Sequence, residues 1–330
     1  MLLPKVSVII INYNGKELLE KCLDSLFKVE YDNFEVLIVD NNSSDNSIEF
    51  ITKNYPSVII IQLDSNKGFA EPNNVAAKIT KCDFLLFLNN DTIVTPNFIS
   101  EMIKAIKNDK KIAICQSLLL KSDNTIDSSG DFMDELGVCF NSKSSVSKIQ
   151  EIFSARGASM LIEKKIFDLM GGFDEKFFAT FEDVDLGWRS WILGYKCVLV
   201  PKSIVYHIGG QTVNIFKSNI AFHGFKNQLA MKITNFESRL ILKKLFQFFL
   251  KYGIRESKIW FDYKINGKTT ITSTKYESEL AAKPNFKIIF KSIFWILKNI
   301  SYLRKKHIQV NKNRKLSTES LIKLNIMLKQ

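Results

Sequence analysis

Three carboxylates fall within four residues, at Glu182, Asp183 and Asp185, where a helical pattern begins that ends near Gly194. A carboxylate at a helix N-terminus is stabilised by the helix dipole, and it acts as a general base where it faces a reacting hydroxyl. Favourable capping of the helix would explain the same carboxylates without any chemistry. The cluster is therefore a candidate for chemistry, with a capped helix start as the structural alternative.

Two further residues are of types that bind a divalent cation. Asp91 follows the apolar run at 84–88, and a carboxylate in that place can ligate a hard cation that also binds phosphate oxygens. His207 is one of only three histidines, and it could complete the ligand shell or contact a diphosphate. The structural alternatives are an Asp that opens a turn and a histidine held in the fold. The carboxylate cluster, Asp91 and His207 together are far stronger evidence for a functional site than any one of them alone.

Short β-branched runs alternate with helical patterns over the first 107 residues, which predicts a mainly parallel sheet flanked by helices. We expect strands at 6–12, 34–39, 58–63 and 84–88, and helices at 15–27, 44–54, 72–79 and 96–107. Ligands of such sheets bind beyond the carboxyl ends of the strands. Each expected strand is followed by polar side chains, at 12–15, 40–43, 64–68 and 89–92. A further strand is expected at 197–200, and the less regular residues 120–160 fit a variable, substrate-facing region.

The composition is that of an ordered globular protein: 330 residues, 46% hydrophobic and 24% charged, with 14 Gly and 6 Pro. These values exclude collagen-like, linker-like and disordered classes. The five cysteines are scattered without a CxxC pair, which argues against a disulfide framework or a zinc site and for a reducing compartment. The first residues lack the features of a signal peptide, so export is not expected.

Charge divides the chain near residue 210. Residues 1–210 hold 22 Lys and Arg against 28 Asp and Glu, whereas residues 211–330 hold 24 against 6. The basic character therefore belongs to the last third, and we expect two regions with different tasks.

The last third contains the apolar stretches 240–250 and 286–303, neither of which is a long uninterrupted apolar run, so a spanning helix is not expected. In the second stretch, four lysines fall within roughly 40° of a helical wheel, opposite four isoleucines. The lysines are Lys287, Lys291, Lys298 and Lys305, and the isoleucines are Ile289, Ile293, Ile296 and Ile300. This pattern predicts a basic amphipathic helix. It would either bind an anionic membrane surface or pack on the catalytic domain with a solvated lysine face. No nucleic-acid-binding motif is present, so we expect no nucleic acid partner.

Six motifs in this order resemble the inverting GT-A glycosyltransferases of family 2, in the rhamnosyltransferase-like subgroup. They are VSVIIINYNG at 6–15, VLIVDNNSSD at 36–45, NKGFAEPNN at 66–74, LLFLNND at 85–91, GGFDE at 171–175 and FEDVDLGWR at 181–189, with His207 downstream. The resemblance covers about residues 4–210. It implies a GT-A catalytic domain at 1–210, followed by a basic helical region at 211–330.

The resemblance also assigns roles to residues. It implies that Asn12, Tyr13, Asn14, Asn66, Lys67, Gly68 and Asn90 line the donor nucleotide, and that Asp40 accepts a hydrogen bond from a pyrimidine base. Asp91 and His207 would bind Mg²⁺ or Mn²⁺, although Asn89-Asn90-Asp91 holds a single carboxylate where the fuller motif has two. Asp183 would be the general base, with Glu182, Asp185 and Arg189 in supporting or acceptor-side positions.

The function implied is transfer of a sugar from a nucleoside-diphosphate sugar, dTDP-rhamnose or a UDP-hexose, to a hydroxyl of a glycan or polyprenyl-linked acceptor. This transfer would serve the synthesis of cell-surface polysaccharide or glycoprotein glycan. The alternative is a non-catalytic nucleotide-sugar-binding or scaffold protein of a glycan assembly complex. We expect a cytoplasmic enzyme that is peripheral on the cytoplasmic face of the cell membrane.

Overall fold

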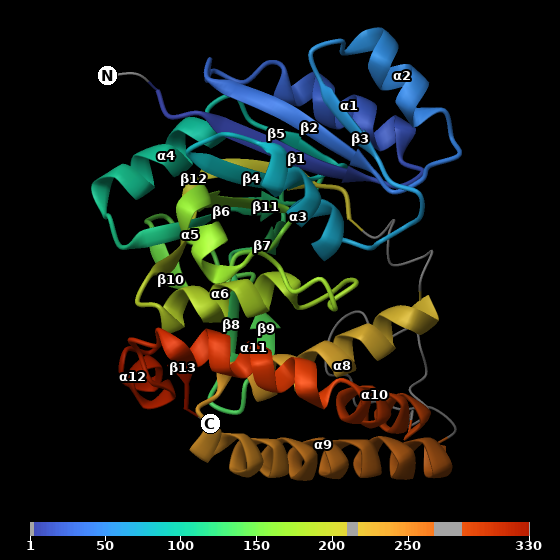
Figure 1. Ribbon diagram of the computed structural model, residues 1–330, viewed down its shortest axis with the longest axis vertical. Helices are drawn as coiled ribbons and strands as arrows, with labels where there is room; N and C mark the ends of the chain where they lie inside the picture. Colours follow the sequence, from blue (N-terminus) through green and yellow to red (C-terminus); the bar gives the residue numbers. More distant parts are fainter. Residues whose placement is uncertain (1–2, 210–216, 267–285, 330) are drawn as a thin grey trace.

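A ten-stranded mixed sheet forms the centre of the computed structural model, which describes residues 3–209, 217–266 and 286–329 (Figure 1). The strand order is β10-β12-β6-β11-β4-β1-β2-β3, with β5 paired to β12 and β7 paired to β6. The strands are β1 (Val6–Asn12), β2 (Phe34–Asp40), β3 (Ile59–Gln62), β4 (Phe84–Asn89), β5 (Thr92–Val94), β6 (Ile112–Leu120), β7 (Ile126–Ser128), β10 (Gln150–Ile152), β11 (Ser159–Glu163) and β12 (Lys196–His207).

Helices cover both faces of this sheet. They are α1 (Lys16–Leu26), α2 (Ser47–Asn54), α3 (Ala70–Ile79), α4 (Phe98–Asn108), α5 (Lys164–Met170) and α6 (Glu182–Ile192). A three-stranded sheet of order β13-β8-β9 lies beside the large one, with β8 (Asp131–Asp134), β9 (Cys139–Asn141) and β13 (Met327–Leu328). Apolar side chains from the two faces of the large sheet form two buried clusters. The predicted sheet flanked by helices is confirmed.

Parallel pairing brings the polar strand ends to one edge of the sheet. β1 lies between β2 and β4 and is parallel to both, and Asn12 is paired in register with Asp40. The Val and Ile side chains of β1 are almost all buried, as expected for a strand that is covered on both faces. The polar residues after β1, β2 and β4 therefore meet in space.

The strand that delivers His207 is longer than expected. The prediction of a strand at 197–200 stopped before Pro201, whereas β12 continues to His207. The register of β12 against β6 shifts between Val200 and Ile204, and such a bulge accommodates a proline within a sheet. Because of this bulge, β12 continues past Pro201 and ends at His207.

The basic region after residue 216 is helical, as predicted. Its helices are α8 (Lys217–Asn235), α9 (Ser238–Asn266), α10 (Phe286–Lys298), α11 (Ile300–Lys312) and α12 (Thr318–Lys323). The expectation of one continuous helix over 286–303 is wrong, because α10 ends at Lys298 and α11 begins after Asn299. The Asn299 side chain donates to the Trp295 carbonyl oxygen at 2.8 Å and closes α10. Lys305 therefore lies on another helix from the three lysines of α10.

These C-terminal elements pack against the sheet domain within a shared core. The Trp188 ring of α6 lies 4.8 Å from the Phe236 ring and 5.9 Å from the Phe153 ring, centroid to centroid. At the chain end, Met327 of β13 pairs with Met133 of β8. The functional division at residue 210 stays a prediction. No helix of the described residues is long and apolar enough to cross a membrane.

We predict that Trp188→Ala lowers the free energy of unfolding by about 3–5 kcal/mol, because it leaves a large cavity where α6 meets Phe236. Urea denaturation followed by circular dichroism would measure the change. Leu242→Ala is the control, because Leu242 is 82% exposed and its truncation should change stability by no more than about 0.5 kcal/mol. Equal effects of the two variants would contradict the shared core.

Candidate active site

The ends of β1, β2 and β4 are joined by hydrogen bonds among the predicted nucleotide-binding residues. The Asn12 amide donates to Asp40 Oδ1 at 3.2 Å and to Ser43 Oγ at 3.1 Å. Asn12 Oδ1 in turn accepts from Asn90 Nδ2 at 3.1 Å. Asp40 Oδ2 accepts from the Ser43 backbone N–H at 2.8 Å. Both carboxylate oxygens of Asp40 keep acceptor capacity, since each has more than one lone pair.

The turns beside this cluster hold the other predicted nucleotide residues. Asn14, at a φ of 51°, accepts from the Ser44 N–H at 2.7 Å, and the half-buried Tyr13 precedes it. Asn66 Oδ1 accepts from the Gly68 N–H at 2.9 Å, whereas the Lys67 ammonium lies 3.5 Å from Asp64. Gly68 has a φ of 80°, and a Cβ there would overlap the Phe178 carbonyl. Glycine is therefore required where this turn meets the segment that leads to Asp183.

The predicted metal-binding pair comes together as expected from its residue types. His207 Nε2 lies 3.3 Å from Asp91 Oδ1, and His207 Nδ1 lies 3.0 Å from Asp127 Oδ2 on β7. Burial alone would lower the pKa of His207, but its hydrogen bonds to Asp127 and Asp91 outweigh burial and raise the pKa to about 9. A carboxylate on Nδ1 fixes the ring orientation, so that Nε2 faces Asp91.

This pair fits a divalent cation that is held jointly with a diphosphate. Asp91 Oδ1 is buried, and it faces the imidazole nitrogen Nε2 of His207 at 3.3 Å. The described part of the chain contains no group of three His, Cys, Asp or Glu that could hold a metal ion. Mg²⁺ and similar ions are commonly held by one or two side chains together with substrate phosphates. Asp91 and His207 would thus supply the protein ligands.

Asp183 lies in the first turn of α6 and is partly accessible. Its Oδ2 accepts from the Gly157 N–H at 3.1 Å, and its Oδ1 accepts from the Val184 N–H at 2.8 Å. Burial raises the pKa of Asp183, while these N–H groups and the Arg156 charge oppose the rise. The residue is a carboxylate with a raised pKa and fixed orientation, which suits a general base.

The other two carboxylates of the cluster have different surroundings. Asp185 forms an ion pair with Arg189 at 2.7 Å, in which both side chains are 2% exposed, and it accepts from Asn235 Nδ2 at 2.8 Å. Asp185 therefore ties α6 to α8, whereas Arg189 donates to the Met170 carbonyl at 2.9 Å and ties α6 to α5. Glu182 is buried, and desolvation together with the charge of Asp183 raises its pKa well above the ordinary value. Burial therefore favours the protonated form of Glu182 beside Asp183.

Arg156 places a cation among three carboxylates. Its Nε donates to Asp131 Oδ1 at 3.1 Å, and its charge also acts on Asp127 and Asp183. Desolvation raises the pKa of the buried Asp131 to about 6, even though Arg156 opposes that rise. Arg156 therefore links the electrostatics of the metal-binding pair to those of Asp183.

The turn before α6 has an unusual backbone that α8 holds in place. Thr180 and Phe181 have φ values of 71° and 67°, a left-handed conformation that side chains other than glycine rarely adopt. Asn227 of α8 is fully buried, and its amide donates to the Ala179 carbonyl at 3.0 Å and the Thr180 carbonyl at 2.7 Å. The C-terminal region thereby fixes the direction in which the chain enters Glu182 and Asp183.

Four residues of this site were not singled out from the sequence: Asp127, Asp131, Arg156 as a charged group, and Asn227. Residues 120–160 had been assigned only as a substrate-facing region. Their residue types are common ones. Nothing in the local sequence indicates which groups they contact from other parts of the chain.

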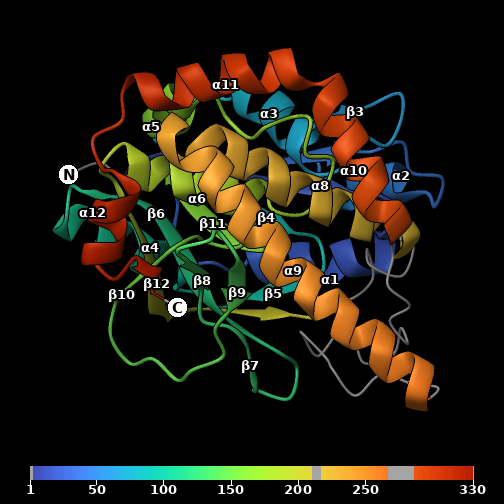
Figure 2. The same cartoon turned by 90° about the horizontal axis from the view of Figure 1, so that it is seen from below.

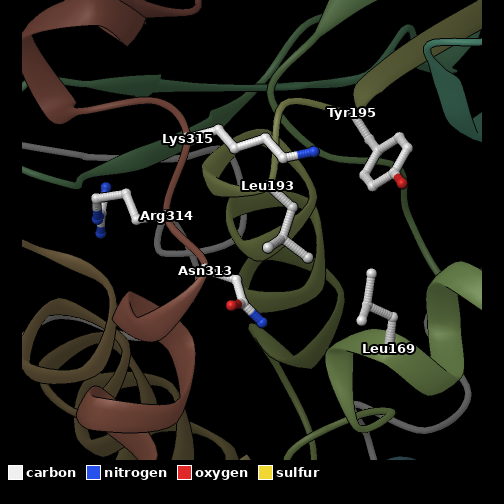
Figure 3. Close-up of a pocket in the computed structure, with 6 residues that line it drawn as sticks. All are labelled: Leu169, Leu193, Tyr195, Asn313, Arg314 and Lys315. Carbon is white, nitrogen blue, oxygen red and sulfur yellow. The ribbon is translucent and has the colours of Figure 1, made fainter.

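A surface hollow of about 410 Å³ lies elsewhere (Figure 3). It is lined by Leu169, Leu193, Tyr195, Asn313, Arg314 and Lys315, none of which belongs to the site. In the close-up, the Lys315 side chain extends over the hollow toward Tyr195.

Residues 7–170 match the family model described as Glycosyl transferase family 2. The O-antigen biosynthesis protein RfbC of Myxococcus xanthus is 28% identical over 220 residues, which cover 62% of this chain and 17% of RfbC. The poly-beta-1,6-N-acetyl-D-glucosamine synthase of Staphylococcus aureus is 23% identical over 214 residues, which cover 64% of this chain and 52% of the synthase. The chain belongs to glycosyl transferase family 2, and it spans about half or less of the length of these two relatives.

The fold agrees with this family. The mannosyltransferase PcManGT of Pyrobaculum calidifontis, solved in complex with GDP-Man and Mn²⁺, matches with a TM-score of 0.57 and 14% identity. The match covers 95% of this chain and 88% of that chain. The expected GT-A fold is confirmed.

We predict that Asn227→Ala lowers the rate of sugar transfer more than it weakens donor binding, because the turn before α6 loses two hydrogen bonds. Initial rates and nucleotide titration calorimetry would separate these effects, and thermal unfolding would show the accompanying loss of stability. Asn311→Ala is the matched control, because the Asn311 amide donates to the Thr234 and His307 carbonyls at 3.1 and 2.8 Å away from the site. Equal losses of transfer in the two variants would contradict a positioning role.

Proposed function

We propose that this protein is an inverting glycosyltransferase that moves a sugar from a nucleoside-diphosphate sugar to a hydroxyl of a glycan or polyprenyl-linked acceptor. The observation that carries the proposal is the state of Asp183. It is the one carboxylate of its cluster that is half-buried rather than buried, and two backbone N–H groups orient it. This arrangement suits proton removal from an acceptor hydroxyl.

The donor would lie along the edge formed by the ends of β1, β2 and β4. Asp40 would accept from the N3–H of uracil or thymine, and the turn at Gly68 would allow close approach of ribose and diphosphate. Asp91 and His207 would hold a divalent cation on the diphosphate, and a bound cation there stabilises the charge of the leaving group. dTDP-rhamnose is the donor favoured by subgroup resemblance, with a UDP-hexose as the close rival.

In the reaction, Asp183 accepts the proton of the acceptor hydroxyl while that oxygen forms a bond to the anomeric carbon. The bond from that carbon to the diphosphate breaks, and its electron pair leaves with the nucleoside diphosphate. A single displacement of this kind inverts the anomeric configuration and needs one base. Burial favours the protonated form of Glu182, and in that form the side chain would not compete for the proton.

The names of the two relatives favour a role in building surface polysaccharide, and we propose this role for the chain. A polyprenyl-linked acceptor would place the protein at the cytoplasmic face of the membrane. The rival function is a non-catalytic nucleotide-sugar-binding protein, which has no need of an oriented Asp183.

We predict that Asp183→Asn abolishes acceptor-stimulated release of the nucleoside diphosphate and leaves donor binding nearly unchanged. The assay would use dTDP-rhamnose and several UDP-sugars with a lipid-linked acceptor extract, in Mg²⁺, Mn²⁺ or EDTA. Asp185→Asn is the control, because it makes the same Asp-to-Asn change in the same helix. It should lower stability through the broken pair with Arg189, while any folded fraction keeps turning over. Normal turnover by Asp183→Asn would rule out its role as base, and donor binding without turnover by the parent protein would favour the rival.

We predict that Arg156→Gln shifts the acid limb of the transfer rate to higher pH. A base with a raised pKa loses its ionised form as the pH falls through that pKa, and removing a nearby cation raises the pKa further. Rates measured from pH 5 to 9 with saturating donor would show the shift. Arg156→Lys retains the charge and should shift the limb less, so an equal shift in both variants would contradict the electrostatic explanation.

A further inference from the structure

The helix α9 exposes a line of large apolar side chains to solvent. Leu242, Phe246, Leu250 and Ile254 are 82%, 70%, 55% and 51% exposed. Their spacing of four residues places them along one side of the helix. The opposite side contributes Phe248, which is 4% exposed, to the core. Packing within the described structure therefore accounts for the apolar residues on only one side of α9.

The helix α10 has a second exposed apolar line. Phe290, Phe294 and Leu297 are 70%, 69% and 64% exposed, whereas Ser292 and Ile296 on the other side are buried against the fold. The exposed side is thus formed mainly by Phe and Leu. Of the isoleucines expected to oppose the lysines, Ile296 is buried and Ile293 is 37% exposed. The exposed Lys287, Lys291 and Lys298 follow one edge of this line, within roughly 40° of each other on the helical wheel.

The two lines lie at the same end of the molecule. Figure 1 places α9 and α10 at the end opposite α1 and α2, and Figure 2 shows both helices on the side seen from below. We name the exposed residues of these lines, Leu242, Phe246, Leu250, Ile254, Phe290, Phe294 and Leu297, the apolar end surface. The other described helices of the basic region lie behind or beside α9 and α10 in Figure 2.

Charge around the apolar end surface indicates what covers it. The sequence of α9 carries seven Lys and Arg against two Asp and Glu, and that of α10 carries three lysines and no acidic residue. Residues 1–210, in contrast, have an acidic excess. Two copies that met through this surface would bring like charges together, which is unfavourable. Exposed Phe and Leu beside lysines suit a layer that is apolar inside and anionic at its surface.

We infer that the apolar end surface inserts into the headgroup region of an anionic lipid membrane. The Phe and Leu side chains enter the layer, and the lysines beside them remain at the level of the lipid phosphates. The protein then binds with α9 and α10 against the membrane and with α1 and α2 away from it. The inference does not depend on the proposed transfer, because it rests on exposure and charge alone.

The test is co-sedimentation of the full chain with phosphatidylcholine vesicles that contain either 30% phosphatidylglycerol or none. The parent protein should bind the anionic vesicles at low salt and lose most of this binding in 0.5 M NaCl or without the anionic lipid. The variant Phe290→Ser, Phe294→Ser, Leu297→Ser should bind at least tenfold more weakly. The double variant Leu242→Ser, Phe246→Ser tests α9 separately in the same way.

The matched control is Ile79→Ser, Leu169→Ser, which removes two apolar side chains that are 57% and 54% exposed on other helices. It should bind like the parent protein. Absence of binding by the parent protein, or equal binding by all variants, would overturn the inference. So would light scattering that shows a dimer in the parent protein and a monomer in the α10 variant, with vesicle binding unchanged. Donor turnover measured without vesicles separates these outcomes from failure of the proposed transfer.

Discussion

The left-handed turn at Thr180 and Phe181 is the constraint on which the site depends. Two successive residues of this kind cost about 1–3 kcal/mol each, so the surrounding fold must hold them. The buried Asn227 amide does so through the carbonyl groups of Ala179 and Thr180. Because α6 begins directly after the turn, its direction, and with it the orientation of Asp183 toward the Gly157 N–H, follows from this hydrogen bonding.

The same start of α6 separates three carboxylates that look equivalent in the sequence. Arg189 and Asn235 use both oxygens of Asp185, so that residue serves packing between α6 and α8. Burial without a cation raises the pKa of Glu182 well above its ordinary value. Asp183 accepts from the Gly157 and Val184 N–H groups, which favour its charged form while its pKa remains raised. Pairs of acids whose environments differ in this way are typical of acid–base sites.

Local patterns predicted the strands and the polar side chains at their ends, because alternating β-branched and helical runs are typical of such a sheet. The contact of Asn12 with Asp40 came from the structure. The same reasoning failed for the C-terminal side of β12, where a bulge rather than a stop follows Val200. It also failed for the helix over 286–303, because α10 ends before Asn299, whose side chain donates to the Trp295 carbonyl. Asp127, Arg156 and Asn227 act through partners far away in the chain, which no spacing rule reveals.

The charge division near residue 210 led us to expect two regions with different tasks, yet α8 takes part in both. Its side toward α6 supplies Asn227 and Asn235, which hold the turn and pair with Asp185. Elsewhere α8 packs against α9 and α10, and the outer sides of these two helices form the apolar end surface. The single helix α8 therefore connects α9 and α10 to the turn before Asp183. Under the proposed function, the basic region would both support the proposed base and hold it near a lipid-linked acceptor.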